Sequence, residues 1–245
     1  MHAFSASQAT SSVLTNLPAA ADPVASTSGN YLYVPLLNNL FATFGLGATL
    51  GRLQLQSPSL LAIQPYDVSP VDAAALPSSP LAIEMMQTSP FKLTTDEPLQ
   101  CLVTNGGTEN DAAFVFLSDG PIAPVTGEII RARATATSSS TGNTWQNATI
   151  TMTNPLAEGT YNLVGARLEG SHLIAGRFVF PAGAATTRPG CIATNSVSKL
   201  SYEAFRDGNL GVWGTFSNRV LPTIDLWSDG TSETVTMILD LIKTG

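Results

Sequence analysis

The chain has 245 residues and a formal net charge of −7, and charged residues make up only 12% of it, about half of the usual share. This balance excludes nucleic-acid binding by bulk electrostatics, which needs clustered Lys and Arg. The length suffices for one large β domain or two small ones. A surface so poor in charge is expected either in a protein covered by copies of itself or in an ordinary secreted β protein.

Residues 1–30 are rich in Ser, Ala and Thr, show no hydrophobic periodicity and contain no Lys or Arg. This composition predicts a flexible N-terminal arm. The arm also lacks the basic start and the continuous apolar run of a signal peptide, so we expect no secretion by that route.

Residues 31–90 are predicted to form an extended, Pro-rich segment with short strands. The first part of this segment, residues 31–51, is uncharged and mostly apolar but is interrupted by Pro35, Asn38, Asn39 and three glycines. These interruptions argue against a membrane-spanning helix. We expect residues 31–51 to pack on the body of the protein or on a neighbouring subunit, or else to contact a membrane surface.

Residues 91–245 show the alternation that is typical of β-strands. Ala132, Ala134 and Ala136 share one face with Ile130, and Arg and Thr side chains occupy the other face. Residues 127–154 and 160–180 each predict a hairpin, the second with its turn at residues 169–171. In the first strand of the hairpin predicted at residues 160–180, the alternation places Tyr161, Leu163 and Gly165 on one face.

About eight strands are predicted over residues 91–245, and turns rather than amphipathic helices separate them. Such a series predicts an all-β, antiparallel sandwich or barrel. One short helical turn is expected at residues 199–208, where Gly208 is a suitable terminator.

The chain has two histidines, and neither predicts a catalytic site. His172 follows the turn at residues 169–171, where Glu169 offers a partner for acid–base chemistry, but no candidate nucleophile lies within the hairpin. His2 lies in the predicted arm, and two histidines cannot form a zinc cluster. The phosphate-binding motifs GxxxxGK[ST] and GxGxxG and the GxSxG motif of hydrolases are absent. We therefore expect His172 to be a solvated loop residue.

Paired carboxylates, as in glycosidases, are the remaining catalytic candidate. Four acidic residues lie around the last two strands: Asp225, Asp229, Glu233 and Asp240. Asp240 has apolar neighbours on both sides, so we expect it to be partly buried, with a raised pKa or with an ion pair to Arg177 or Arg219. The turn SDGTSE at residues 228–233 is a weak calcium-binding signal.

The three tryptophans, Trp145, Trp213 and Trp227, are scattered over separate strands and are expected in the core rather than in a sugar-binding groove. Cys101 and Cys191 lack CxxC spacing and are expected to be two buried free thiols rather than a disulfide. We therefore predict no catalytic residue, no cofactor-binding residue and no metal ligand, and we predict that the protein is not an enzyme.

Three features resemble the jelly-roll coat proteins of small tailless icosahedral viruses. They are the series of short strands over residues 91–245, the RPG loop at residues 188–190, and the ending NLGVWGTF…LPTIDLWSDG…VTMILDLI. The resemblance is one of architecture and texture. It implies one jelly-roll sandwich over residues 91–245, preceded by the arm and the extended segment, with two compact jelly rolls as the alternative. It also implies a capsid protein of the virion that self-assembles through lateral contacts between copies.

The N-terminal arm departs from many RNA-virus coat proteins because it cannot neutralise a genome. We therefore expect no nucleic-acid contact through it. The departure favours shells lined by other virion proteins or by an internal membrane, as in membrane-containing phages, with residues 31–51 as the contacting segment. A carbohydrate-binding or adhesion module is the alternative and predicts an exposed aromatic groove. A glycan hydrolase is less favoured and predicts two convergent carboxylates.

Overall fold

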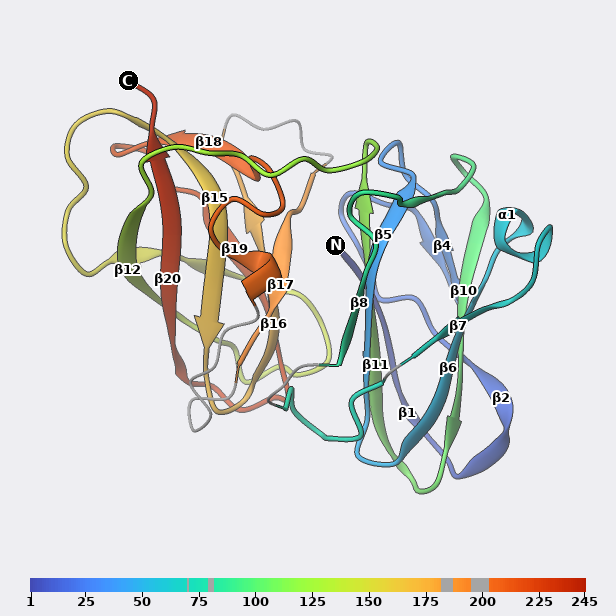
Figure 1. Ribbon diagram of the computed structural model, residues 1–245. Helices are drawn as coiled ribbons and strands as arrows, with labels where there is room; N and C mark the ends of the chain where they lie inside the picture. The colour runs from blue at the N-terminus through green and yellow to red at the C-terminus, as the bar shows by residue number, and fades with distance from the viewer. Residues whose placement is uncertain (70, 79–81, 182–186, 195–202) are drawn as a thin grey trace. The chain divides into compact units, whose positions relative to one another are not determined.

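The computed structural model describes residues 1–69, 71–78, 82–181, 187–194 and 203–245. Its regular structure consists almost entirely of β-strands in antiparallel ladders (Figure 1), which confirms the all-β antiparallel class expected from the sequence. The chain divides into two compact units, the N-terminal unit Met1–Pro121 and the C-terminal unit Ile122–Gly245. Each unit contains two β-sheets.

The N-terminal unit has one sheet in the order β1-β11-β5-β8, in which β9 also pairs with β5. The second sheet has the order β3-β4-β10-β6-β7, in which β2 also pairs with β10. The strands are β1 (His2–Gln8), β2 (Ser11–Leu17), β3 (Thr27–Ser28), β4 (Tyr31–Tyr33), β5 (Asn39–Leu46), β6 (Leu50–Gln56), β7 (Tyr66–Val68), β8 (Ile83–Met85), β9 (Phe91–Lys92), β10 (Pro98–Asn105) and β11 (Glu109–Ser118). A one-turn helix, α1 (Pro58–Leu61), follows β6.

The C-terminal unit has one sheet in the order β14-β12-β20-β15-β18 and a second in the order β13-β19-β16-β17. The strands are β12 (Ile130–Thr137), β13 (Gln146–Thr149), β14 (Thr151–Met152), β15 (Thr160–Glu169), β16 (Leu173–Val179), β17 (Gly190–Ile192), β18 (Gly214–Ser217), β19 (Thr223–Ser228) and β20 (Thr234–Lys243). A 3-10 turn, η1 (Glu203–Phe205), lies between β17 and β18.

Both units have the same strand order. The eight principal strands of the N-terminal unit are β1, β2, β5, β6, β7, β8, β10 and β11, and those of the C-terminal unit are β12, β13, β15, β16, β17, β18, β19 and β20. Numbered along the chain within each unit, they give one sheet with the order 1-8-3-6 and one with the order 2-7-4-5. This is the order of a jelly roll, in which two Greek keys form two facing sheets. The chain thus contains two compact jelly rolls, and the single roll over residues 91–245 is wrong.

The first 30 residues are not a flexible arm. Strand β1 pairs with β11 over seven residues, and β2 pairs with β10. Phe4 is fully buried in the core of the N-terminal unit. Because this order comes from pairing with strands about 100 residues away in the sequence, local composition gives little sign of it.

Residues 31–90 form the third to sixth principal strands of the N-terminal unit rather than an extended covering segment. Strand β5 lies inside its sheet between β11 and β8, and its residues 40–46 are all buried. Strand β5 of this segment therefore packs within the N-terminal unit. Within the described part of the chain, no helix has the length and apolar character needed to cross a membrane.

Neither predicted hairpin of the C-terminal unit is a hairpin. Strand β12 pairs with β20 and β14, whereas β13 pairs with β19 in the other sheet. Strands β15 and β16 also lie in different sheets, so the turn at residues 169–171 crosses between the two sheets of the sandwich. Alternation reveals which face of a strand is buried, but it does not reveal which strand is its neighbour.

The face assignments hold where the strands are regular and fail at a bulge. Ala132, Ala134 and Ala136, which were predicted to share a face with Ile130, are all buried, whereas Ile130 at the start of the strand is exposed. In β15, however, the register with β20 shifts between Leu163 and Gly165. The bulge moves Gly165 away from the face that carries Leu163, so that Gly165 pairs with Asp240.

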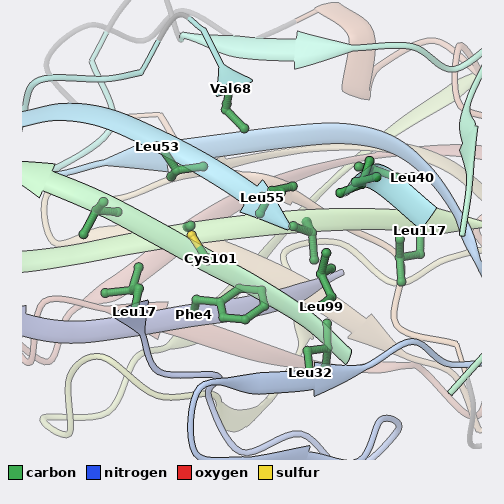
Figure 2. Close-up of a cluster of buried hydrophobic side chains, with 14 of the residues drawn as sticks. Phe4, Leu17, Leu32, Leu40, Leu53, Leu55, Val68, Leu99, Cys101 and Leu117 are labelled. Carbon is green, nitrogen blue, oxygen red and sulfur yellow. The ribbon is translucent and has the colours of Figure 1, made fainter. Parts of the chain in front are cut away.

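One hydrophobic core cluster of the N-terminal unit consists mainly of aliphatic side chains, with one buried phenylalanine and one cysteine (Figure 2). It draws residues from both sheets, including Phe4, Leu17, Leu53, Leu99 and Cys101. Both cysteines of the chain are buried and free, as expected. Burial raises the pKa of both thiols, which keeps them protonated and unreactive at neutral pH.

Substitution of Phe4 tests whether the first strand is an integral part of the fold. Phe4→Ala should lower the free energy of unfolding of the N-terminal unit by about 3–5 kcal/mol, because it leaves a cavity in the core. Val13→Ala, at a side chain that is 70% exposed, is the control and should change it little. The measurement is urea denaturation followed by circular dichroism. Equal behaviour of the two variants would show that the first strand is detachable.

Candidate functional site

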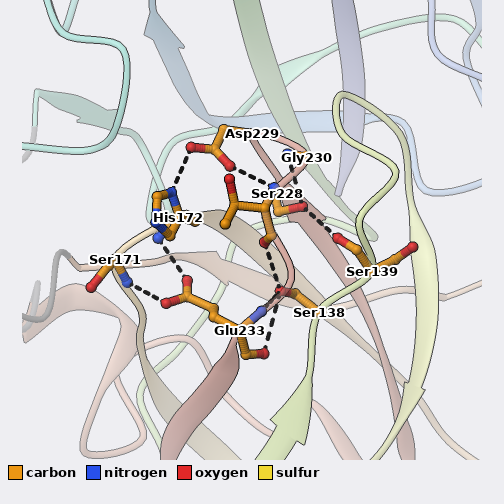
Figure 3. Close-up of polar contacts among 9 residues, drawn as sticks. Ser138, Ser139, Ser171, His172, Ser228, Asp229, Gly230 and Glu233 are labelled. Carbon is orange, nitrogen blue, oxygen red and sulfur yellow. Dashed lines mark hydrogen bonds and ion pairs between the residues drawn. The ribbon is translucent and has the colours of Figure 1, made fainter.

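A cluster of hydrogen-bonded polar side chains lies at one end of the C-terminal unit (Figure 3). Three segments meet there. Ser138 and Ser139 follow β12, Gly170–His172 connects β15 to β16, and residues 228–233 connect β19 to β20. The jelly-roll topology brings these segments to one end of the sandwich, although up to 95 residues separate hydrogen-bonded groups within the cluster.

Glu233 fastens two of these segments together. Its Oε2 atom accepts a hydrogen bond from the backbone N–H of Ser171 at 2.8 Å, and its Oε1 atom accepts one from that of His172 at 2.6 Å. The backbone N–H of Glu233 donates to Oγ of Ser138 at 2.9 Å. A Cβ atom on Gly170 would lie 2.5 Å from Oε1 of Glu233, so this turn needs glycine for the carboxylate to approach.

His172 is paired with Asp229 across the same end. The Nδ1 atom of His172 lies 2.8 Å from Oδ2 of Asp229, and the two side chains are 40% and 33% exposed. The hydrogen bond to Asp229, together with the negative charges of Asp229 and Glu233, raises the pKa of His172 above its ordinary value. His172 is thus an exposed loop residue, but it is held in an ion pair.

The partner of His172 is Asp229 and not Glu169, the partner expected from the sequence. Glu169 lies near Arg167 at 3.6 Å, whereas the carboxylate that contacts His172 comes from a turn 57 residues later in the chain. The only local signal for that turn was the Asp-Gly pair in SDGTSE. His2, the other histidine, lies on β1 with its Nδ1 atom 2.9 Å from Oδ2 of Asp22, and both side chains are buried.

The geometry around His172 is that of an imidazole–carboxylate pair formed with Asp229. The hydroxyl of Ser138 donates to backbone carbonyls of the turn at residues 231–233, and the hydroxyl of Ser228 donates to the carbonyl of Ser139. These serines therefore serve the loop structure. Among the described residues, no group of three or more His, Cys, Asp or Glu side chains is placed to hold a metal ion.

Asp225 lies apart from this cluster in a buried ion pair on the other sheet. Its Oδ2 atom accepts a hydrogen bond from Nε of Arg177 at 3.0 Å, and its Oδ1 atom accepts one from Asn147 at 2.9 Å. The guanidinium of Arg177 also lies 4.3 Å from the ring centroid of Trp145. Arg177 thus pairs with Asp225, and its expected pairing with Asp240 is wrong.

Asp240 is fully buried and forms the ion pair expected of it, but with a different arginine. It accepts hydrogen bonds from Nε and Nη2 of Arg206 at 2.7 and 3.0 Å, and one from the backbone N–H of Asp207 at 3.0 Å. Arg219 instead pairs with Glu158 at the surface. Each of the four carboxylates therefore has a structural partner of its own.

The segment that carries Arg206 overlaps the expected helical turn. The turn η1 immediately precedes Arg206, and Gly208 follows with a φ of +77°, a conformation that favours glycine. Residues 199–202 of the expected turn lie outside the described residues. The guanidinium of Arg206 thus ties this loop to the face of β20 that bears Asp240.

Two of the three tryptophans are core residues, as predicted. Trp227 is fully buried and Trp213 is nearly so. Trp145 is half-buried and packs edge-to-face against Trp227 at a centroid distance of 5.1 Å. The three tryptophans therefore do not form an exposed aromatic groove.

A small cleft of about 240 Å³ lies in the N-terminal unit beside α1. It is lined by Leu60, Ile63, Gln64, Pro65, Tyr66, Asp67 and Phe91. Its one carboxylate is already engaged, because Asp67 accepts two hydrogen bonds from Arg52 at 2.7 and 2.9 Å and one from Gln54 at 3.1 Å.

Comparison with known proteins identifies no relative of this chain. The chain matches no protein-family model, no curated protein and no solved structure at a significant level.

Titration of His172 tests the loop cluster. Asp229→Asn should lower the pKa of His172 toward its ordinary value, because the variant removes the charge of its hydrogen-bonded partner. Glu169→Gln is the control and should leave that pKa close to the wild-type value. The measurement is an NMR titration of the imidazole protons. A larger effect of Glu169→Gln than of Asp229→Asn would contradict the described pairing.

The buried pair of Asp240 and Arg206 is expected to be important for stability. Asp240→Asn should lower the free energy of unfolding of the C-terminal unit by about 3–5 kcal/mol, because it leaves the Arg206 charge buried without its counter-ion. Arg219→Gln removes one partner of an exposed pair and should have little effect. Chemical denaturation of both variants measures the difference, and equal effects would argue against the buried pair.

Proposed function

We propose that this protein is a structural subunit that assembles with copies of itself into a shell, as the coat protein in the virion of a tailless icosahedral virus. The single observation that carries the proposal is the tandem pair of jelly rolls with the same strand order. The jelly roll is a recurrent architecture of viral coat proteins, and it is also found in lectins and cupins. A second observation, the low proportion of charged residues, favours the coat protein among these functions.

Most of the positively charged side chains form ion pairs with acidic groups of the same chain. Seven of the 11 Lys and Arg residues form ion pairs in the described part of the chain: Arg52, Arg131, Arg167, Arg177, Arg188, Arg206 and Arg219. A surface with few free charges offers weak electrostatic repulsion between copies. It therefore favours close lateral contact through methyl, hydroxyl and backbone groups.

The surfaces of the two units supply the proposed contacts. Strands β1 and β2 are part of the N-terminal unit, so the first 30 residues are not an arm that crosses to a neighbour. The large hydrophobic side chains that are at least 48% exposed are Val13, Leu36, Leu61, Ile63, Val212 and Val220. These side chains are candidate contact points between copies. A closed oligomer with threefold symmetry would present six jelly rolls from three chains.

The proposal is tested by the state of the purified protein at high concentration. We expect regular capsomers or shells in negative-stain electron microscopy and a matching fast-sedimenting species in analytical ultracentrifugation. The concentration series should show growth of that species by mass action. A monodisperse monomer at every concentration, without ordered particles under varied salt and pH, would contradict the proposal.

The cleft beside α1 favours a carbohydrate-binding module as the second candidate. Tyr66 and Phe91 contribute aromatic rings to it, and Gln64 contributes an amide that is able to bond sugar hydroxyls. The engagement of Asp67 with Arg52 weighs against this candidate, because it leaves the cleft few free polar groups. Glycan-array binding that is lost in Tyr66→Ala, by a protein that stays monomeric, would favour this candidate over the shell subunit.

A further inference from the structure

The same end of each jelly roll is fastened in the same way. In the N-terminal unit, Oε1 of Glu109 accepts hydrogen bonds from the backbone N–H and the hydroxyl of Thr49 at 2.6 and 2.7 Å. In the C-terminal unit, Glu233 accepts hydrogen bonds from the backbone N–H groups of Ser171 and His172. Each glutamate stands at the start of the eighth principal strand, and each donor turn directly precedes the fourth principal strand. We call this arrangement the glutamate clamp.

A second acidic residue lies beside the clamp of the N-terminal unit. Asp111 follows Glu109 by two residues on β11, so both side chains point to the same face. Asp111 is only 1% exposed. Its Oδ2 atom accepts a hydrogen bond from Nδ2 of Asn105 at 2.5 Å. A Cβ atom on Gly47 would lie 2.1 Å from its Oδ1 atom, so Asp111 is packed directly against the turn that the clamp holds.

Among the groups around Asp111, the carboxylate of Glu109 disfavours its negative charge and the amide of Asn105 favours it. Cys101 on β10 is a buried thiol, and Glu109 on β11 is a second carboxylate. Asn105 on β10 supplies the one stabilising hydrogen bond. No Lys, Arg or His of the described residues forms an ion pair with Asp111. Burial, and to a lesser extent the charge of Glu109, raises the pKa of Asp111 to about 6, against the effect of Asn105.

The clamp of the C-terminal unit has a histidine in place of the second acid. The charged groups that face His172 are Asp229, at 2.8 Å, and Glu233, whose carboxylate binds the backbone N–H of His172. A protonated imidazole neutralises these two carboxylates, whereas a neutral one leaves both charges in the same turn. Protonation therefore stabilises this clamp as well, although the group that takes up the proton is of opposite chemical type.

We propose that the two glutamate clamps form a pH-sensitive device that is tight at acidic pH and loosens as the pH rises, the N-terminal clamp at lower pH than the C-terminal clamp. The sign is the same in both units. Asp111 has a folded-state pKa above its unfolded value of about 3.9, so its contribution to stability is complete at low pH and is lost as the pH rises to about 6. His172 also has a raised pKa. Its contribution is complete below the ordinary histidine value of about 6.5 and is lost as the pH rises through the higher folded-state value.

Both clamps are formed within one chain. Their pH response can therefore be tested independently of the proposed shell assembly. Hydrogen–deuterium exchange of the whole protein tests it at pH 5 and pH 8, after correction for the intrinsic exchange rate. The informative amides are those of Thr49 and Gly106 in one clamp and of Ser171 and His172 in the other. For the N-terminal clamp, a folded-state pKa of about 6 against an unfolded value of about 3.9 corresponds to an increase in the opening constant of about 10-fold between pH 5 and pH 8.

Two variants separate the two clamps. Asp111→Asn should remove most of the pH dependence at Thr49 and Gly106 and leave that at Ser171 unchanged. His172→Gln should do the reverse. Asp119→Asn, at an exposed carboxylate beyond the far end of β11, is the matched control and should change neither. If Asp111→Asn fails to fold, Glu109→Gln takes its place. It removes the like charge but not the burial of Asp111, so it should reduce the pH dependence at Thr49 and Gly106 without abolishing it. Wild-type protection that is independent of pH would overturn the proposal.

A bound cation is the rival explanation for the N-terminal clamp. Oδ1 of Asp111, Oε2 of Glu109 and Oδ1 of Asn105 are buried and accept no hydrogen bond, and calcium prefers such oxygen ligands. Exchange is therefore measured at pH 8 with EDTA and with calcium chloride. Equal exchange in the two conditions supports the proton-driven device. Protection restored at Thr49 and Gly106 by calcium alone would overturn it for this clamp.

Discussion

The fold depends on the pairing of the last strand of each jelly roll with strands from its beginning and its middle. Strand β11 lies between β1 and β5, and β20 lies between β12 and β15. No sheet of this order is complete until its eighth strand has been placed, so the first strand of each unit has its longest pairing with residues about 100 positions later. This long-range pairing turns a weakly patterned N-terminal stretch into part of a core. It also brings the turns before the fourth and eighth strands to one end of each sandwich.

The sequence was informative where a property repeats along one strand. Alternation in β12 identified the buried face of Ala132–Ala136, and closely spaced turns without helices predicted the all-β class. Neighbours across the sheets could not be read in this way, because alternation is the same whether two successive strands form a hairpin or cross between sheets. The two predicted hairpins failed for this reason. The bulge after Leu163 also escaped, since one extra residue changes the face of a side chain without changing the local composition.

The candidate site was predictable only as separate residues. His172 was recognisable from the sequence, but its partner Asp229 comes from a turn 57 residues away. Asp111 was harder to recognise, because the segment ENDAAFVFLS begins like an ordinary turn and continues like an ordinary strand. Only the register of β11 against β5, which sets Ala112 opposite Leu46, places the Asp111 carboxyl against Gly47. The surroundings of a charged side chain such as Asp111 depend on strand register. They are therefore the feature of this protein that is hardest to predict from the sequence.

The placement of charge links the interior of the protein to its proposed role. Buried pairs such as Arg177 with Asp225 and Arg206 with Asp240 add little net stability compared with well-packed apolar residues, yet each fixes the position of a loop or strand. Arginines used in this way are unavailable to the surface. The net charge of −7 is then carried mainly by acidic groups, some of which lie at the clamp ends. If copies meet through such ends, acid would both tighten each chain and reduce repulsion between chains, so folding and association would respond to pH in the same direction.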